Sequence, residues 1–271
     1  SVAANLGHTK SMLNLAYMLY RGDGIEVNKI ESFNYFKICS DKGNVDAINN
    51  CGIIQMQSEN FIEAANCFKK ASELGSFKAM NNYATCLYQG KGVEKDVNLA
   101  ISLYRNAAEN EDEEAMNNYA NFLLKGEELP KNEALAFEYF KKAAEKGNIF
   151  AAYNYAQMIN EGKFEKYDRE KIMKLLKYAA DKEHSYAALL YAQMLLEDGN
   201  KKEAKKYFKI SSDLKNIDAN YLYGKGLYLG EFGEANKVLG FIHLKEANDN
   251  DNKNAGIFLS IDLLAKSCNI A

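Results

Sequence analysis

The three histidines are the residues of this chain best suited to binding a metal or moving a proton near neutral pH. His8, His184 and His243 are scattered along the sequence, and none has a cysteine or an acidic residue at ligand spacing. No motif such as G-x-S-x-G places a nucleophile beside a base. We therefore expect no catalytic residue, no bound metal and no cofactor, with His8 and His184 exposed in turns.

A short glycine-rich segment, Gly-Lys-Gly at residues 90–92, offers a second kind of chemistry, phosphate binding. It follows a helical pattern rather than a strand, and it lacks the Lys-Ser or Lys-Thr ending of a phosphate-binding loop. The sequence therefore predicts a turn that ends a helix.

Composition narrows the classes of partner. The net charge is −3 and the isoelectric point is near 5.8, so the chain lacks the positive field that nucleic acids and anionic lipids attract. No apolar run approaches the length that spans a bilayer. The chain does not begin with Met, which suggests processing or cutting from a longer protein.

The cysteines are odd in number and irregularly spaced, which predicts buried free thiols and favours the cytoplasm. They are Cys39, Cys51, Cys67, Cys86 and Cys268.

A recurring small residue, usually alanine, divides the chain into repeats. These anchor residues stand 32 or 36 positions apart, a period typical of a solenoid in which each unit contacts its neighbours. They are Ser11, Ala47, Ala79, Ala115, Ala151, Ala187, Ala219 and Ala255. We expect a single repeat domain over residues 1–271, with a partial repeat at 1–10 and a final partial repeat from residue 255.

The pattern of each repeat predicts two helices. Apolar residues at helical spacing follow every anchor, and the first helix of most units stops at a glycine. An Asn or Asp stands 19 residues before the next anchor and is expected to cap the second helix. These caps are Asn28, Asn60, Asp96, Asn132, Asp168, Asn200 and Asn236. Glu31, Glu63 and Glu203 would complete capping boxes. In the two units of 32 residues, only the loop between the helices is expected to be shorter.

The units that begin at Ala79 and Ala115 resemble Sel-one-like repeats, the glycine-looped relatives of tetratricopeptide repeats. The resemblance covers essentially the whole chain and rests on the anchor alanine and the Tyr-Ala step. It also rests on the Gly-x-Gly-Val loop at 90–93 and the Ala-Ala-Glu segment at 107–109. The resemblance implies an all-α fold, a right-handed α-α superhelical solenoid of stacked antiparallel helix pairs. It also implies a non-catalytic scaffold or adaptor whose first helices line a concave groove.

The resemblance further implies that positions two, six, nine and ten beyond each anchor face the groove. Side-chain amides, which both donate and accept hydrogen bonds, predominate there and could hold a peptide backbone. We expect a protein or peptide to bind at Asn81, Tyr88, Asn117, Asn121, Tyr153, Gln157 and Gln193. A chain rich in Asn and Lys would also place solvated amides at these positions without any ligand.

Two other functions remain open. Apolar residues gather at groove positions near the ends, which would suit a structural component of a larger assembly. These include Leu13, Tyr17, Tyr20, Ile257, Ile261 and Leu264. The repeats could also form a regulatory module of a larger multidomain protein such as a kinase.

Overall fold

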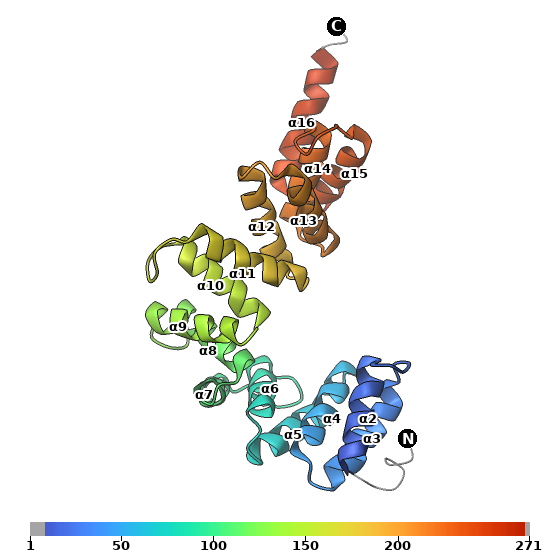
Figure 1. The fold of residues 1–271 in the computed structure, drawn as a ribbon, viewed down its shortest axis with the longest axis vertical. Coiled ribbons are helices and arrows are strands. Elements are labelled where there is room, and N and C mark those ends of the chain that lie inside the picture. Colours follow the sequence, from blue (N-terminus) through green and yellow to red (C-terminus); the bar gives the residue numbers. More distant parts are fainter. Residues whose placement is uncertain (1–8, 269–271) are drawn as a thin grey trace. The chain divides into compact units, whose positions relative to one another are not determined.

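The computed structural model describes residues 9–268, and the side chains of residues 9–263. Within the described residues the chain forms 15 helices and no strand, as expected for the all-α class (Figure 1). First helices of the repeats are α2 (Thr9–Arg21), α4 (Val45–Gln57), α6 (Phe77–Gln89), α8 (Glu113–Lys125), α10 (Ile149–Asn160), α12 (Ser185–Glu197), α14 (Ile217–Leu229) and α16 (Lys253–Cys268). Second helices are α3 (Lys29–Asp41), α5 (Phe61–Glu73), α7 (Val97–Glu109), α9 (Glu133–Glu145), α11 (Arg169–Asp181), α13 (Lys201–Asp213) and α15 (Lys237–Asp249).

The chain divides into two compact units, residues 1–143 and residues 144–271. Within each unit, helices that follow one another pack together and small residues let them approach closely. At Gly52 of α4, an added Cβ would lie 2.6 Å from the ring of Phe68 on α5, so a larger residue would displace that ring. Phe68 is buried, so its ring packs directly against the backbone of α4 at this helix pair.

The glycine loops end the first helices as expected. Gly90 adopts the left-handed conformation at the end of α6, with φ of 69°, and its amide donates to the carbonyl of Cys86. Gly92 lies so close to α5 that a Cβ would stand 1.9 Å from the carbonyl oxygen of Phe61. The Gly-Lys-Gly segment is therefore a helix-ending turn that packs on the preceding helix pair.

The predicted Asx residues stand at the starts of the second helices, and six of the seven accept a backbone hydrogen bond through their side chains. Asn60 is the exception, because its amide instead donates to the side chain of Gln55 over 2.7 Å. Of the capping boxes predicted at Glu31, Glu63 and Glu203, the half in which the cap accepts from the backbone amide of the glutamate forms at Asn28 and Asn200. The other half, in which the glutamate accepts from the backbone amide of the cap, is wrong. The backbone amides of these three caps donate to carbonyls of the preceding helix, those of Leu19, Gln55 and Leu195. These backbone amides are therefore already hydrogen-bonded without the glutamate side chains.

The cysteines with described side chains are free thiols in helix interfaces. Cys39, Cys51 and Cys86 are buried, and Cys67 is half-buried. Burial raises the pKa of Cys51 to about 12 and that of Cys86 to about 11. These thiols stay protonated at neutral pH and act as small apolar core residues. The side chain of Cys268 lies outside the described residues.

Candidate binding surface

Asparagine side chains connect successive first helices in the first unit. Asn82 of α6 donates to the amide oxygen of Asn49 on α4 over 3.0 Å, and Asn118 of α8 donates to that of Asn81 on α6 over 2.9 Å. Asn81 also donates to the Glu114 carboxylate over 3.2 Å. The amides therefore form an asparagine ladder, defined here by Asn49, Asn81, Asn82 and Asn118, that runs from helix to helix.

Two of the predicted binding residues lie on the inner side of this arrangement. Asn81 and Asn117 are only 3% and 7% exposed, so a peptide would reach their amides only by opening the contact between neighbouring helices. The signal for this role is present in the sequence as adjacent asparagines at 49–50, 81–82 and 117–118. In the first two pairs, the first member accepts the ladder hydrogen bond from the next first helix.

A pocket of about 340 Å³ opens in the first unit between α6, α7 and α8, and we call it the aromatic pocket. Tyr88, Tyr104 and Phe122 form its floor, with the Tyr88 ring edge-on to Phe122 at 5.2 Å between centroids. Asn121 and Lys125 contribute polar groups at its lining. The structure thus brings together Tyr88 and Asn121, two of the predicted binding residues.

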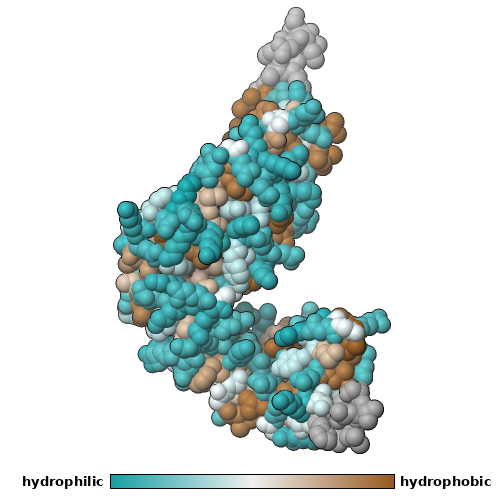
Figure 2. All heavy atoms as spheres, in the orientation of Figure 1, coloured by the Kyte–Doolittle hydropathy of each residue, from teal (hydrophilic) through white to brown (hydrophobic). Residues whose placement is uncertain are grey.

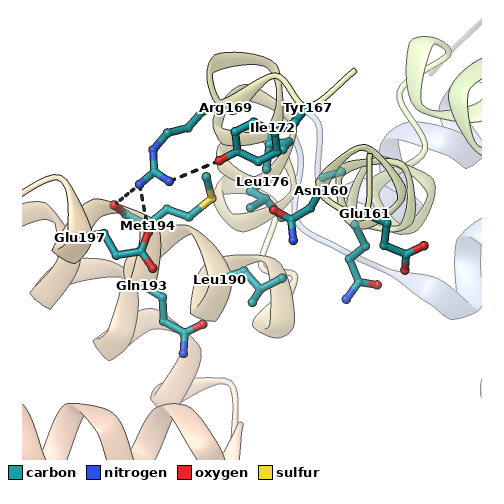
Figure 3. A pocket seen from close by; sticks show the side chains of 12 residues that line it. Asn160, Glu161, Tyr167, Arg169, Ile172, Leu176, Leu190, Gln193, Met194 and Glu197 are labelled. Atoms are coloured by element: carbon teal, nitrogen blue, oxygen red, sulfur yellow. Dashed lines mark hydrogen bonds and ion pairs between the residues drawn. The ribbon is translucent and has the colours of Figure 1, made fainter. Parts of the chain in front are cut away.

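A second pocket, of about 410 Å³, opens in the second unit between α10, α11 and α12, and we call it the acidic pocket (Figure 3). Ile172, Leu176 and Leu190 give it an apolar floor. Gln157 of α10 and Gln193 of α12 line it, so two further predicted residues meet here. Gln157 is exposed and Gln193 is half-buried, which leaves both amides within reach of a ligand.

Arg169 of α11 fixes one wall of the acidic pocket. Its guanidinium donates to Asp198 over 2.8 Å, to Glu197 over 3.1 Å and to the Met194 carbonyl over 3.1 Å. It also contacts the Tyr167 hydroxyl at 3.5 Å, and hydrogen bonds to Tyr167 and Asp198 raise the pKa of Arg169. Figure 3 shows this network on the α12 side of the pocket, away from Asn160 at the end of α10 and Glu161 just after it. Arg169 was not among the predicted residues because its partners come from another repeat.

An aromatic cluster lies next to the acidic pocket. Tyr153 stacks on His184 with 4.7 Å between ring centroids, and Phe150 meets His184 edge-on at 5.2 Å. The Tyr153 hydroxyl accepts from Gln157 over 2.9 Å, which joins this cluster to the pocket lining. Tyr153, predicted to bind, is therefore half-buried and engaged with its neighbours. Tyr186 completes the cluster, 6.4 Å from Tyr153.

The expectation that His184 is exposed is wrong. The side chain is half-buried because the rings of Phe150 and Tyr153 pack on it, and its Nδ1 accepts from the amide of Ala187 to cap α12 over 3.1 Å. Burial lowers the pKa of His184, which favours the neutral ring that this cap requires. His8 lies outside the described residues.

Residues 9–263 contain no group of three or more His, Cys, Asp or Glu side chains arranged to hold a metal ion. No described helix is both long and apolar enough to cross a membrane.

Comparison with protein families decides the identity of the repeats. The Sel1 repeat model matches seven consecutive segments, residues 9–44, 48–76, 77–112, 113–148, 149–184, 185–216 and 217–252. The chain belongs to the Sel1 repeat family. The resemblance drawn from the alanine anchors and glycine loops is therefore confirmed, including its extent along the chain. A search of curated proteins finds no significant match.

Solved Sel1 repeat structures have the same fold. One is c5321, a protective antigen of uropathogenic Escherichia coli with an SLR fold, which is 20% identical with a TM-score of 0.70. The match covers 94% of this chain and 56% of that one, so the chain spans only part of that protein's length. A Sel1 repeat protein of Oxalobacter formigenes is 19% identical with a TM-score of 0.69, and the match covers 95% of this chain and 77% of that one. At these identities the likeness establishes the helical repeat fold, which is commonly a protein-interaction scaffold.

Proposed function

We propose that this Sel1 repeat chain is a non-catalytic scaffold or adaptor that holds a peptide, or an extended segment of a partner protein, against its first helices. One observation carries the proposal: in each unit a pocket opens between neighbouring first helices. Residues singled out by repeat position alone line both pockets, Tyr88 and Asn121 in one, Gln157 and Gln193 in the other.

The lining chemistry suits a polypeptide ligand. Each pocket combines an apolar floor with amide groups that can donate to carbonyls and accept from backbone N–H groups. Asn81 supports this surface indirectly, because its side chain joins α6 to α8. Asn117 is buried rather than open to a ligand. We therefore assign direct contact to Tyr88, Asn121, Gln157 and Gln193, with Tyr153 beside them.

Affinity capture from an extract of the native cell tests this proposal. Wild-type chain is compared with a Gln157→Ala and Gln193→Ala double variant and with an Asn121→Ala variant. Asn98→Ala provides the matched control because Asn98 is an exposed amide on the second helix α7, outside both pockets. A partner lost from the pocket variants and kept by the control supports the proposal. A partner retained by every variant would place binding on another surface.

A second candidate function is a structural component of a larger assembly. It is favoured by exposed apolar side chains on α16, where Ile257, Ile261 and Leu263 are 59%, 61% and 62% exposed. Figure 2 shows this apolar surface beside the grey C-terminal end, over α15 and α16. In the capture experiment, loss of the partner from an Ile257→Asp and Ile261→Asp variant, but not from pocket variants, would favour assembly through this end.

A further inference from the structure

We infer that the acidic pocket receives a lysine or arginine side chain of the bound segment. This inference rests on the proposed peptide-binding function and adds a chemical preference to it. Three features carry it: the shape of the pocket, the balance of charge around it, and the commitment of its guanidinium to internal partners.

The shape fits one long, unbranched side chain. The floor is apolar, with Ile172 and Leu176 buried at 2% and 1% exposure and Leu190 beside them. Lysine and arginine carry aliphatic stems that cover such surfaces while their charged ends stay near water. A pocket of about 410 Å³ between three helices leaves room for that stem with its end at the rim.

The charge at the rim is negative. Arg169 is the only cation among the lining residues, and it is paired with Glu197, which also lines the pocket, and with Asp198 from outside the lining. Glu161 lines the pocket as a third carboxylate. Figure 3 places Glu197 and Glu161 on opposite sides of the apolar floor. Two formal negative charges therefore remain after Arg169 is offset, and a cation entering between them would be attracted.

Arg169 does not provide a competing site for an anion. Its donors already reach Tyr167, the Met194 carbonyl and two carboxylates, as described above. An anionic ligand would have to displace these intramolecular carboxylates, whereas a cationic ligand leaves the network intact. The amide oxygens of Gln157 and Gln193 can accept further hydrogen bonds from an ammonium or guanidinium group.

Selection of random linear peptides on the immobilised full chain tests the inference, followed by fluorescence polarisation of labelled synthetic peptides. Each selected peptide is also made with norleucine in place of lysine or citrulline in place of arginine, which keeps the length and removes the charge. Binding is measured with wild-type chain, Glu161→Gln, and the Gln157→Ala and Gln193→Ala double variant. Glu170→Gln is the matched control, since Glu170 follows Arg169 in the chain but does not line the pocket.

We expect one position of the selected peptides to be basic, and removal of its charge to weaken binding by about tenfold. Glu161→Gln should weaken binding by about threefold, as for a partly exposed ion pair, and Glu170→Gln should not. Glu161 is the informative variant because Glu197→Gln would also disturb Arg169.

The remaining outcomes separate the two proposals. Peptides that lose affinity in the glutamine double variant, yet tolerate loss of the basic charge, would overturn the lysine or arginine preference and leave the scaffold function standing. Equal losses in Glu161→Gln and Glu170→Gln would also overturn it, since the effect would come from overall charge. Selection of no peptide that depends on either pocket would overturn both.

Discussion

The aromatic pocket and the acidic pocket are built by the same parts of successive repeats and yet differ in chemistry. Each lies between two first helices and the second helix that connects them. The first has an aromatic floor and Lys125 as its one charged lining residue, whereas the second has an aliphatic floor with Glu161, Glu197 and Arg169. The helix scaffold is thus separable from the recognition surface, and the two should respond differently to substitution.

Replacing the small residue at helix crossings should give the largest effect, and the same effect in both units. Ala84 on α6 and Ala192 on α12 occupy the same repeat position and are fully buried. Ala84→Leu and Ala192→Leu should each lower the free energy of unfolding by about 1–3 kcal/mol through overpacking. Urea unfolding followed by circular dichroism measures this loss. An unchanged midpoint in either variant would contradict the shared packing.

Reversing charge should distinguish the pockets. With a basic peptide selected on the acidic pocket, Glu161→Lys should weaken binding by about tenfold, or about 1.4 kcal/mol, because like charges then face each other. Lys125→Glu in the aromatic pocket should leave that affinity unchanged. Fluorescence polarisation at low and high salt measures both variants, and added salt should reduce the difference. Equal responses of the two variants would mean that net charge, rather than the pocket, governs binding.

The junctions between repeats provide a smaller comparison. Gly75 in the first unit and Lys215 in the second both adopt left-handed backbone conformations, with φ of 89° and 64°. Lys215→Gly should raise the free energy of unfolding by about 1 kcal/mol, because glycine adopts this conformation without strain. Gly75→Ala should lower it by a similar amount, although open space surrounds the new methyl group. Thermal unfolding of both variants checks the opposite signs.

The smallest expected effect is a change in local helix stability with pH. It differs between equivalent helices because they are capped by different residues. Asp112 caps α8 and His184 caps α12, both through the side chain. Burial lowers the pKa of His184 below 6.5 in the folded chain, so its contribution is present above that pH and is lost as the pH falls. We expect α12 to lose up to about 1 kcal/mol of local stability between about pH 7 and about pH 5.

Hydrogen exchange at the first amides of α12 measures this change, and His184→Asn is the control. Asparagine caps the first helices α10 and α14 in the same way, so this variant should keep α12 capped at both pH values. Burial raises the pKa of Asp112, so folding favours the protonated form of this cap. The contribution of Asp112 to stability therefore grows, rather than declines, as the pH falls through the same range. Similar acid sensitivity of α8 and α12 would refute the assignment to His184.

The sequence predicts the helical scaffold well because its signals are local. Anchor alanines, glycine ends and Asx caps each act within a few residues of their own position. The glutamate half of the capping boxes failed because the backbone amides of Asn28 and its equivalents donate to carbonyls of the preceding helix, a contact that spacing within one helix does not specify.

The binding surface is less predictable because it depends on which side of a helix each neighbour covers. Asn81 is buried, whereas Asn82, the next residue on the same helix, is half-buried. Arg169 is beyond sequence reasoning of this kind because its carboxylate partners are 28 and 29 residues away in the next repeat. The predicted glutamines, by contrast, do line a pocket, although ligand binding there stays a prediction.

The asparagine ladder has a consequence for how such a chain can change in length. Donor and acceptor are the same residue type, carried at adjacent positions of each unit from Asn49 to Asn118. A duplicated copy of the unit that begins near Ala79 would bring its own pair, accept from the next copy and donate to the previous one. The stack could therefore grow or shorten by whole units during evolution, or in an engineered array, without stranding a buried amide at the new junction.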